Sequence, residues 1–320
     1  MDLNLYEYKA ETAFSHKDLL SIHDLTQDEV YQILSLGLKL KAQSKAGIPH
    51  PLLKGKTLGM IFQKSSTRTR VSFEVGIYQL GGYGLFLSSN DLQLGRGETI
   101  ADTARVLSRY LDGIMIRTFK QKDVEDLAHY SSIPVINGLT DLLHPCQVLS
   151  DLLTVYEKKQ RFSGLKLAFI GDGNNMAHSL MFGCAKVGMD IALACPEGYM
   201  PDDDIVKAAK ADAQLSGSKI TITTEPAEAI KDADVVYTDV WASMGQEAET
   251  QARKKAMQNY QVNEFLWQLA KPEAIFMHCL PAHRGEEVTD AIIDGPMSVI
   301  FDEAENRLHA QKAIMALLMA

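Results

Sequence analysis

Residues 66–70, with the sequence Ser-Thr-Arg-Thr-Arg, combine hydroxyl and guanidinium groups in one short stretch. The stretch follows an apolar run at 57–62, which predicts a buried strand, and precedes a run with helical spacing that starts near Val71. A strand-to-helix turn exposes backbone N–H groups at the positive end of a helix dipole, where an anion is stabilised. Arginine adds paired donors that fit phosphate or carboxylate. A capped helix with surface arginines is the alternative, but two arginines at one turn favour a phosphate site.

Other polar residues follow the apolar runs that we expect to be strands. In the first half of the chain these are Arg117, His144 and Gln147. In the second half they are Asn174, Asn175, Asp239, residues 243–245 and residues 278–281. Ligands bind at the carboxyl ends of the strands in open parallel sheets. The first set is cationic and rich in donors, whereas the second has amide, carboxylate and thiol groups. This partition suits a phosphate-bearing ligand on one domain and a zwitterionic or cationic ligand on the other.

Several of these residues also have a purely structural interpretation. Arg117 could cap a strand at the surface, and His144 could be a structural histidine at a helix start. Cys279 could be an inert buried thiol, and Asp239 could cap the helix that follows it. For Arg117, a position at a strand end that faces a phosphate turn favours anion binding.

The alternation of apolar runs with helical segments predicts two α/β domains. In the first half, strands are expected at 57–62, 83–87, 113–117 and 134–137, with helices at 28–42, 71–80, 99–110 and 124–130. In the second half, strands are expected at 165–171, 190–194, 219–222, 235–238, 274–277 and 298–301, followed by a terminal helix at 303–319. Such alternation is typical of a parallel sheet. The predicted fold is therefore two doubly wound domains, each with a central parallel β-sheet flanked by helices.

The domain boundary is expected where His144-Pro145-Cys146-Gln147 opens a helix that extends to about Lys159. Its length and position suit a connection between domains. We therefore expect one domain at 1–147, with the helix at 304–320 packing back on it, and a second domain at 148–303. Within the first domain, Val71, Val75, Tyr78 and Leu80 recur near helical spacing and predict the helix after the anion turn.

Composition excludes several classes of protein. The chain has 320 residues and a net charge of −9, so general attraction to nucleic acid or to an anionic membrane is not expected. Its four cysteines are scattered without a C-x-x-C pair, which disfavours a metal cluster or a disulfide framework and favours a reducing compartment. The start of the sequence resembles neither a secretory signal nor a mitochondrial presequence, and no apolar run approaches membrane-spanning length. We expect a cytoplasmic protein.

The segment Gly171-Asp172-Gly173-Asn174-Asn175-Met176 keeps a second function open. It follows an expected strand and has the first two glycines of a dinucleotide-binding turn, with Glu197 at a suggestive distance. Met176 stands where the third glycine would be. An NAD-dependent oxidoreductase is therefore the alternative from a different class.

Taken together, the motifs resemble the aspartate/ornithine carbamoyltransferase family over nearly the whole chain. Residues 66–70 look like its carbamoyl-phosphate signature, and residues 144–147 look like its second motif. Three segments resemble the ornithine branch: Gly171-Asp172-Gly173-Asn174-Asn175, Asp239-Val240-Trp241-Ala242-Ser243-Met244-Gly245 and His278-Cys279-Leu280-Pro281. The tail Glu303-Ala304-Glu305-Asn306-Arg307 matches as well.

The resemblance implies transfer of a carbamoyl group from carbamoyl phosphate to the δ-amine of L-ornithine, without a metal or an organic cofactor. Implied carbamoyl-phosphate ligands are Ser66, Thr67, Arg68, Thr69, Gln93, Arg117, His144, Gln147, Cys279, Leu280 and Arg307. Implied ornithine ligands are Asn175, Asp239, Ser243 and Met244. The residues implied at the reacting centre are Arg117, His144, Asp239 and Cys279. In this family the loop containing Gln93 reaches a neighbouring subunit of a homotrimer, and Leu280–Pro281 is typically cis.

The implied chemistry leaves specific alternatives open. A putrescine or N-acylornithine carbamoyltransferase would share most motifs, although residues 243–245 favour an acceptor with free α-amino and α-carboxyl groups. A non-catalytic relative is a third possibility, against which the intact set of motifs argues. The sequence does not distinguish arginine synthesis from arginine breakdown, and it leaves assemblies of trimers open.

Overall fold

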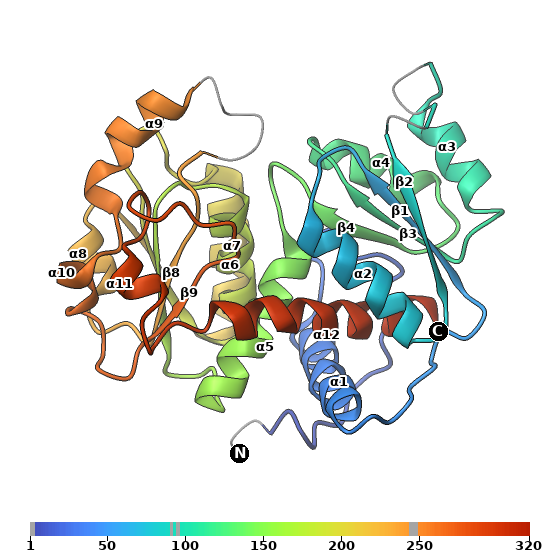
Figure 1. The fold of residues 1–320 in the computed structure, drawn as a ribbon, viewed down its shortest axis with the longest axis horizontal. Helices are drawn as coiled ribbons and strands as arrows, with labels where there is room; N and C mark the ends of the chain where they lie inside the picture. Colours follow the sequence, from blue (N-terminus) through green and yellow to red (C-terminus); the bar gives the residue numbers. More distant parts are fainter. Residues whose placement is uncertain (1–3, 90–91, 94–96, 243–248) are drawn as a thin grey trace. The chain divides into compact units, whose positions relative to one another are not determined.

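The computed structural model describes residues 4–89, 92–93, 97–242 and 249–320. The chain forms two compact units, unit 1 (Met1–Leu153 with Glu305–Ala320) and unit 2 (Thr154–Ala304). The chain passes from one unit to the other inside two helices, α5 (Pro145–Lys159) and α12 (Ile300–Met319). We expected the first boundary at Gln147, which lies in the first turn of the same helix α5. Each unit holds a parallel sheet flanked by helices, as predicted (Figure 1).

Unit 1 contains a four-stranded parallel sheet in the order β2-β1-β3-β4. Its strands are β1 (Thr57–Phe62), β2 (Tyr83–Ser88), β3 (Gly113–Arg117) and β4 (Val135–Leu139). The register pairs Phe62, the last residue of β1, with Arg117, the last residue of β3. The two strands therefore end side by side, which places Arg117 beside the turn that follows β1.

Helices cover both faces of this sheet. The helices of unit 1 are α1 (Gln27–Lys45), α2 (Thr67–Gln79), α3 (Ile100–Leu107) and α4 (Gln121–Tyr130), together with parts of α5 and α12. Apolar residues of α3 and α4 pack with Ile61, Ile114 and Ile116 in one core cluster. On the other face α12 packs closely against the sheet. A Cβ added at Gly113 would lie only 2.9 Å from Met319 Sδ.

The helix α2 confirms the predicted element but not the face that its apolar stripe suggested. Val71, Val75 and Tyr78 are exposed, and Tyr78 keeps 78% of its accessible surface. The buried positions are Thr69, Phe73, Gly76, Ile77 and Leu80. A Cβ at Gly76 would lie 2.9 Å from Met315 Cε, which shows that α12 packs on this stripe. A helix with two apolar stripes gives no local signal about which one faces the core.

Unit 2 contains a five-stranded parallel sheet in the order β7-β6-β5-β8-β9. Its strands are β5 (Lys166–Ile170), β6 (Asp190–Ala194), β7 (Ile220–Thr223), β8 (Val235–Thr238) and β9 (Ile275–Met277). The chain adds strands first on one side of β5 and then on the other. The carboxyl ends of β5 and β8 therefore flank the switch point, where ligands bind in sheets of this kind.

The helices of unit 2 also lie on both sides of its sheet (Figure 1). Two long helices pack together, α6 (Asn175–Val187) and α7 (Asp203–Ser216). A second core cluster joins β5, β6, β8 and β9 to three short helices, α8 (Pro226–Ile230), α10 (Glu264–Trp267) and α11 (Asp290–Ile293). The segment after β8 contains α9 (Thr250–Met257) and a short 3₁₀ helix, η2 (Gln258–Tyr260).

The strand predicted at 298–301 is wrong. Only Ser298 forms a bridge, to Phe276, and α12 begins at Ile300. The carbonyl of Val299 already accepts a helical hydrogen bond from the N–H of Glu303 (2.9 Å). Three apolar residues in a row are too few for periodicity to separate a strand from a helix start.

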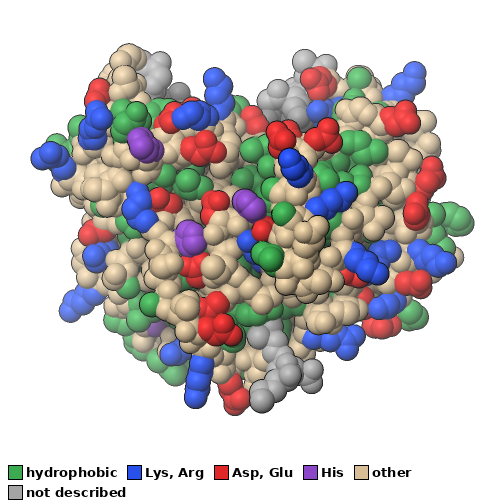
Figure 2. Space-filling view, turned by 180° about the vertical axis from the view of Figure 1, so that it is seen from behind, with side chains coloured by type: hydrophobic (Ala, Val, Ile, Leu, Met, Phe, Trp, Pro, Cys, Tyr) green, Lys and Arg blue, Asp and Glu red, His purple; other side chains and the backbone are tan. Residues whose placement is uncertain are grey.

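Two further features are the distribution of charge on the surface and the apolar character of the helices. Acidic and basic side chains are interspersed over the face drawn in Figure 2. Among the residues that the structure describes, no helix combines the length and the apolar character needed to cross a membrane.

Candidate functional site

The turn after β1 forms the start of α2 in unit 1, as expected. Ser66 is the N-cap, and its hydroxyl accepts a hydrogen bond from the N–H of Thr69 (3.2 Å). Thr67 and Arg68 occupy the first turn of α2. The structure describes every residue of this helix, and its first turn has no acidic side chain. The positive end of the dipole and the Arg68 guanidinium therefore act in the same direction and favour an anion.

Arg307 on α12 ties this turn to the start of α5. Its Nη1 donates to Gln147 Oε1 (2.6 Å) and its Nη2 donates to Thr69 Oγ1 (3.0 Å). Gln147 in turn donates from Nε2 to Asp151 Oδ1 (2.8 Å), which fixes its amide with the oxygen toward Arg307. Arg307, Gln147 and Thr69 are all buried. Because these segments are distant in sequence, only folding brings them together.

His144 lies just before α5 and is buried among three arginines. Its pKa is held well below the ordinary value, first by burial and then by the positive charges of Arg307, Arg117 and Arg68. The imidazole is therefore neutral at physiological pH and can donate one N–H without carrying a charge. We call the assembled residues the anion cluster: Ser66, Thr67, Arg68, Thr69, Arg117, His144, Gln147 and Arg307.

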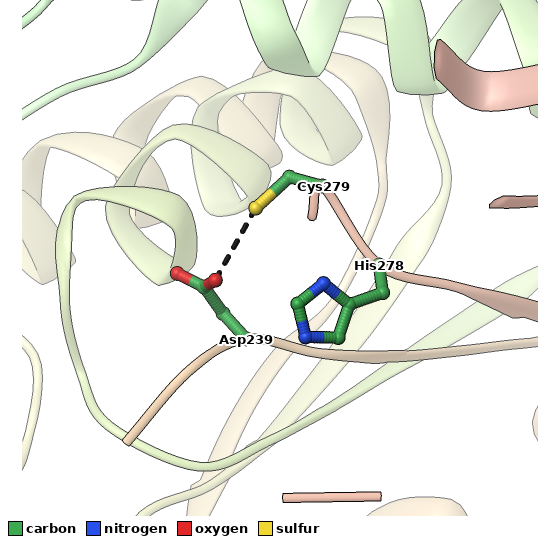
Figure 3. Close-up of side chains that lie close together, drawn as sticks. All are labelled: Asp239, His278 and Cys279. Atoms are coloured by element: carbon green, nitrogen blue, oxygen red, sulfur yellow. Dashed lines mark hydrogen bonds between the residues drawn. The ribbon is translucent and has the colours of Figure 1, made fainter. Parts of the chain in front are cut away.

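In unit 2, a second group of polar residues gathers at the ends of β8 and β9. The Cys279 thiol donates to Asp239 Oδ1 (3.2 Å), and Asn174 Nδ2 donates to Asp239 Oδ2 (2.9 Å). Figure 3 shows the thiol pointing toward the carboxylate, with the ring of His278 beside them. We call Asn174, Asp239, His278 and Cys279 the thiol cluster. These two hydrogen bonds hold one oxygen each and fix the orientation of the Asp239 carboxylate.

A buried network holds the turn that carries Cys279. His278 Nδ1 accepts from the N–H of Leu280 (2.9 Å), so Nε2 carries the proton and donates to Glu287 Oε1 (3.2 Å). Glu303 accepts from the backbone N–H of His278 (2.9 Å). The Leu280–Pro281 peptide is cis, as expected. Asp239, His278 and Cys279 lie close enough to share a metal ion, but both ring nitrogens of His278 already bind protein groups.

The dinucleotide alternative fails at Gly173. A Cβ on Gly173 would lie 2.2 Å from the backbone nitrogen of Pro201, and its N–H donates to the carbonyl of Tyr199 (2.8 Å). The Asn174 side chain accepts from the N–H groups of Met176 (2.9 Å) and Ala177 (3.2 Å) at the start of α6. Protein atoms thus fill the space beside Gly173, and the Asn174 side chain binds the helix N–H groups, so neither is left for a pyrophosphate.

The structure also describes two predicted site residues that are not part of the clusters as defined above. Gln93 is exposed in the segment between β2 and α3, so its contact with a second subunit stays a prediction. Asn175 is the first residue of α6, directly after the capping Asn174. The predictions on Ser243 and Met244 lie outside the described residues.

Some residues that support the clusters gave no sequence signal. Arg253 on α9 donates from Nη1 to Asp172 Oδ2 (2.6 Å), although the two residues are 81 positions apart. Burial raises the pKa of Asp172 above its ordinary value, and the nearby Arg253 opposes that rise.

Two other supporting residues, Gln311 and Asp151, contact the anion cluster. A signal was available for both, because each lies one helical turn after the cluster residue it contacts.

The fold and the two clusters define a two-domain α/β protein with arginine and hydroxyl groups gathered on one domain and amide, carboxylate and thiol groups gathered on the other. Residues 17–157 match the model of the aspartate/ornithine carbamoyltransferase carbamoyl-P binding domain. Residues 163–318 match the model of the Asp/Orn binding domain of the same family. The chain belongs to the aspartate/ornithine carbamoyltransferase family.

Individual relatives agree with this assignment. The ornithine carbamoyltransferase of Thermococcus kodakarensis is 62% identical over 95% of this chain and 96% of its own length. That of Oceanobacillus iheyensis is 63% identical over 95% of this chain and 94% of its own length. The solved structure of ornithine carbamoyltransferase from Pyrococcus furiosus matches with a TM-score of 0.94 and 57% identity, over 96% of this chain and 98% of that one.

Proposed function

We propose that the protein transfers the carbamoyl group of carbamoyl phosphate to the δ-amine of L-ornithine, giving L-citrulline and phosphate. The observation that carries this proposal is the anion cluster, in which the buried Arg307 donates to Thr69 at the start of α2 (3.0 Å) and to Gln147 (2.6 Å). Arg68, Arg117 and His144 lie close by, and burial with these positive charges lowers the pKa of His144. Three cations suit a phosphate, and a neutral N–H donor suits a carbonyl oxygen beside it. Relatives with about 60% identity are named ornithine carbamoyltransferase, which supports the same conclusion.

The anion cluster is suited to the carbamoyl end of the reaction. As the amine attacks the carbonyl carbon, the carbamoyl oxygen gains negative charge. Arg117, His144 and Thr69 are the groups that we assign to stabilise it, because fixed donors in a dry site act most strongly on developing charge. Gln147 presents its amide oxygen, fixed by Asp151, as an acceptor for the carbamoyl NH₂ group. In this proposal the Leu280 carbonyl is the second acceptor.

Loss of phosphate completes the transfer. The C–O bond to phosphate breaks as the C–N bond forms, and the bond electrons leave with the phosphate. Arg68 and the start of α2 offset the added charge. The phosphate can accept the proton that the amine loses, so no side-chain base is required. The amine itself must be neutral to attack, and a cationic, desolvated site lowers its pKa.

The thiol cluster is suited to the amino-acid substrate. We assign Asp239 and Asn175, with Ser243 and Met244, to the α-amino and α-carboxyl groups of ornithine. The Cys279 thiol donates a hydrogen bond to Asp239. That bond requires the protonated thiol, so Cys279 positions the carboxylate and does not act as a nucleophile. The α-carboxyl group separates ornithine from putrescine, and the free α-amino group separates it from N-acylornithine.

Three further properties belong to this proposal: a homotrimer, a cytoplasmic location and chemistry without a cofactor. Five exposed apolar residues of unit 1 support an interface, since they lie on α2 and on the edge strand β2: Val71, Val75, Tyr78, Tyr83 and Phe86. Exposed apolar side chains gathered on neighbouring elements mark contact surfaces. The four cysteines are free, as in proteins of a reducing compartment.

The test is citrulline formation by the purified protein from carbamoyl phosphate and L-ornithine. Putrescine and N-acetyl-L-ornithine serve as competing acceptors at equal concentration. We expect L-ornithine to give the highest kcat/KM. An absence of citrulline, or faster turnover of putrescine, contradicts the proposal. Mass measurement in solution tests the trimer independently of activity.

A further inference from the structure

Gln311 is a buried residue one helical turn after Arg307 on α12, and both belong to unit 1. The neighbouring donors and acceptors assign the orientation of its amide, in which the oxygen accepts hydrogen bonds from Arg307 Nε (3.1 Å) and Nη2 (3.0 Å). Its amide nitrogen donates to Ser72 Oγ (2.5 Å). Gln311 therefore contacts Arg307 on one side and α2 on the other.

Ser72 extends this contact to the first turn of α2. The Ser72 hydroxyl donates to the backbone carbonyl of Arg68 (2.6 Å) and lies 3.2 Å from that of Thr69. The oxygen of the same hydroxyl accepts from Gln311. One neutral amide thus links the two parts of the anion cluster, the helix start that carries Arg68 and the guanidinium of Arg307.

We propose that Gln311 is a positioning residue for the phosphate-bearing substrate, because it fixes the plane of the Arg307 guanidinium relative to the first turn of α2. The identity of that substrate as carbamoyl phosphate rests on the proposed function. An arginine side chain has large rotamer freedom, and its donors act on a ligand only where their direction is fixed. With Nε and Nη2 held by Gln311, the fork directs Nη1 to Gln147 and Nη2 to Thr69.

The charge of the residue at position 311 matters as well. A glutamate in the same place would accept from Arg307 equally well, but it would pair with the guanidinium and cancel its charge. An amide holds the arginine and leaves its positive charge for the ligand. The side chain is thus suited both by shape and by neutrality to a site that must attract an anion.

The adjacent residue Lys312 provides a matched control. It is as deeply buried on the same helix, but it binds Ser44 (2.7 Å), His50 (3.1 Å) and Gln79 (2.8 Å), away from the anion cluster. Replacing it by methionine disturbs the packing of α12 without touching Arg307. If phosphate binding weakens in Gln311→Leu but not in Lys312→Met, the loss is due to the position of the Arg307 guanidinium.

The experiment measures binding of inorganic phosphate by calorimetry, together with steady-state kinetics, on four variants of the full chain. We expect Gln311→Leu and Gln311→Glu to weaken phosphate binding by about tenfold, the scale of one hydrogen bond to a charged group. Ser72→Ala, at a half-buried site, is expected to weaken it by about threefold, since only the link to α2 is lost. Lys312→Met is expected to bind phosphate like the parent.

The kinetic data separate positioning from general damage. In Gln311→Leu the KM for carbamoyl phosphate is expected to rise while the KM for ornithine stays within about twofold. Phosphate binding unchanged in both Gln311→Leu and Ser72→Ala overturns the proposal, and so does an equal loss in Lys312→Met. Phosphate binding does not involve ornithine, so these outcomes stand even if the acceptor proves to be another amine.

Discussion

In unit 1, neutral groups hold the Arg307 guanidinium of the anion cluster, whereas in unit 2, oppositely charged side chains hold one another. Arg307 donates to the oxygens of Gln147, Thr69 and Gln311. In unit 2, Arg253 pairs with both Asp172 and Glu249. The first arrangement keeps positive charge for a ligand. The second uses charge to fix backbone turns, and its ligand groups, Asp239 and Cys279, depend on those turns.

The difference teaches how the two halves should respond to substitution. Removing a cation from unit 1 removes an interaction with the ligand and leaves the protein itself without a new buried charge. Removing a cation from unit 2 leaves a carboxylate buried without compensation, which costs stability. Activity should therefore be the sensitive measure for unit 1, and the free energy of unfolding for unit 2.

The largest effect is expected for Arg68→Ala in unit 1. Loss of the guanidinium that offsets the leaving phosphate should lower kcat by about 10³-fold, the scale of one preorganised charge-stabilising group. The unfolding midpoint should change little. Citrulline kinetics and thermal unfolding measure the two quantities. Arg105→Ala, an exposed arginine on α3, is the control, and near-parental activity of Arg68→Ala would refute the assigned role.

Arg253→Met in unit 2 should have the opposite pattern, with a large loss of stability and a smaller loss of activity. The substitution leaves Asp172 buried without its partner, so the free energy of unfolding should fall by about 3–5 kcal/mol at pH 7. The pKa of Asp172 is already raised by burial. A raised folded-state pKa favours the protonated form, so the loss should shrink as the pH falls.

Denaturant titrations at pH 7 and pH 5 measure this dependence. The double variant Asp172→Asn with Arg253→Met should be more stable than Arg253→Met alone, because no buried charge remains. A double variant as unstable as the single one would show that lost packing, and not the uncompensated carboxylate, causes the defect.

A smaller effect is expected from Cys279→Ala, which removes the thiol donor to Asp239. The KM for ornithine should rise by about tenfold, since the carboxylate that we assign to the substrate loses one hydrogen bond. Cys279→Ser restores a donor and should recover most of the loss. Steady-state kinetics of the two variants decide the point. Equal loss in both would indicate that the thiol contributes through its size or through chemistry other than donation.

The smallest response is expected from His144 on acidification. Burial and three arginines hold its pKa well below the ordinary value, so the imidazole should stay neutral from pH 8 to pH 6. The ¹⁵N shifts of labelled histidines, assigned with a His144→Asn variant, follow this directly. A titration midpoint near 6.5 for His144 would mean that the arginines do not surround it in solution.

Much of the fold could be predicted because the signals are local. Alternating apolar runs with polar ends specify β1, β3, β6 and β8 within a residue or two, and the Ser-Thr-Arg-Thr-Arg turn has the composition of a capped, cationic helix start. The exceptions are short or ambiguous segments. Residues 298–301 are too few to show a period, and α2 offers two apolar stripes of similar width.

The sequence by itself determined the chemistry of both clusters: arginines and hydroxyls after β1 and β3, and a carboxylate and a thiol after β8 and β9. The tertiary structure decided which of these groups meet and in what protonation state. Arg307 reaches Thr69 across 238 positions, and His144 becomes neutral only because burial and three guanidinium groups surround it. Propensity and capping act over a few residues, whereas desolvation and charge act through space. The spacing of four residues on α12 could pair Gln311 with Arg307, but no local pattern could show that Gln311 also reaches Ser72 on α2.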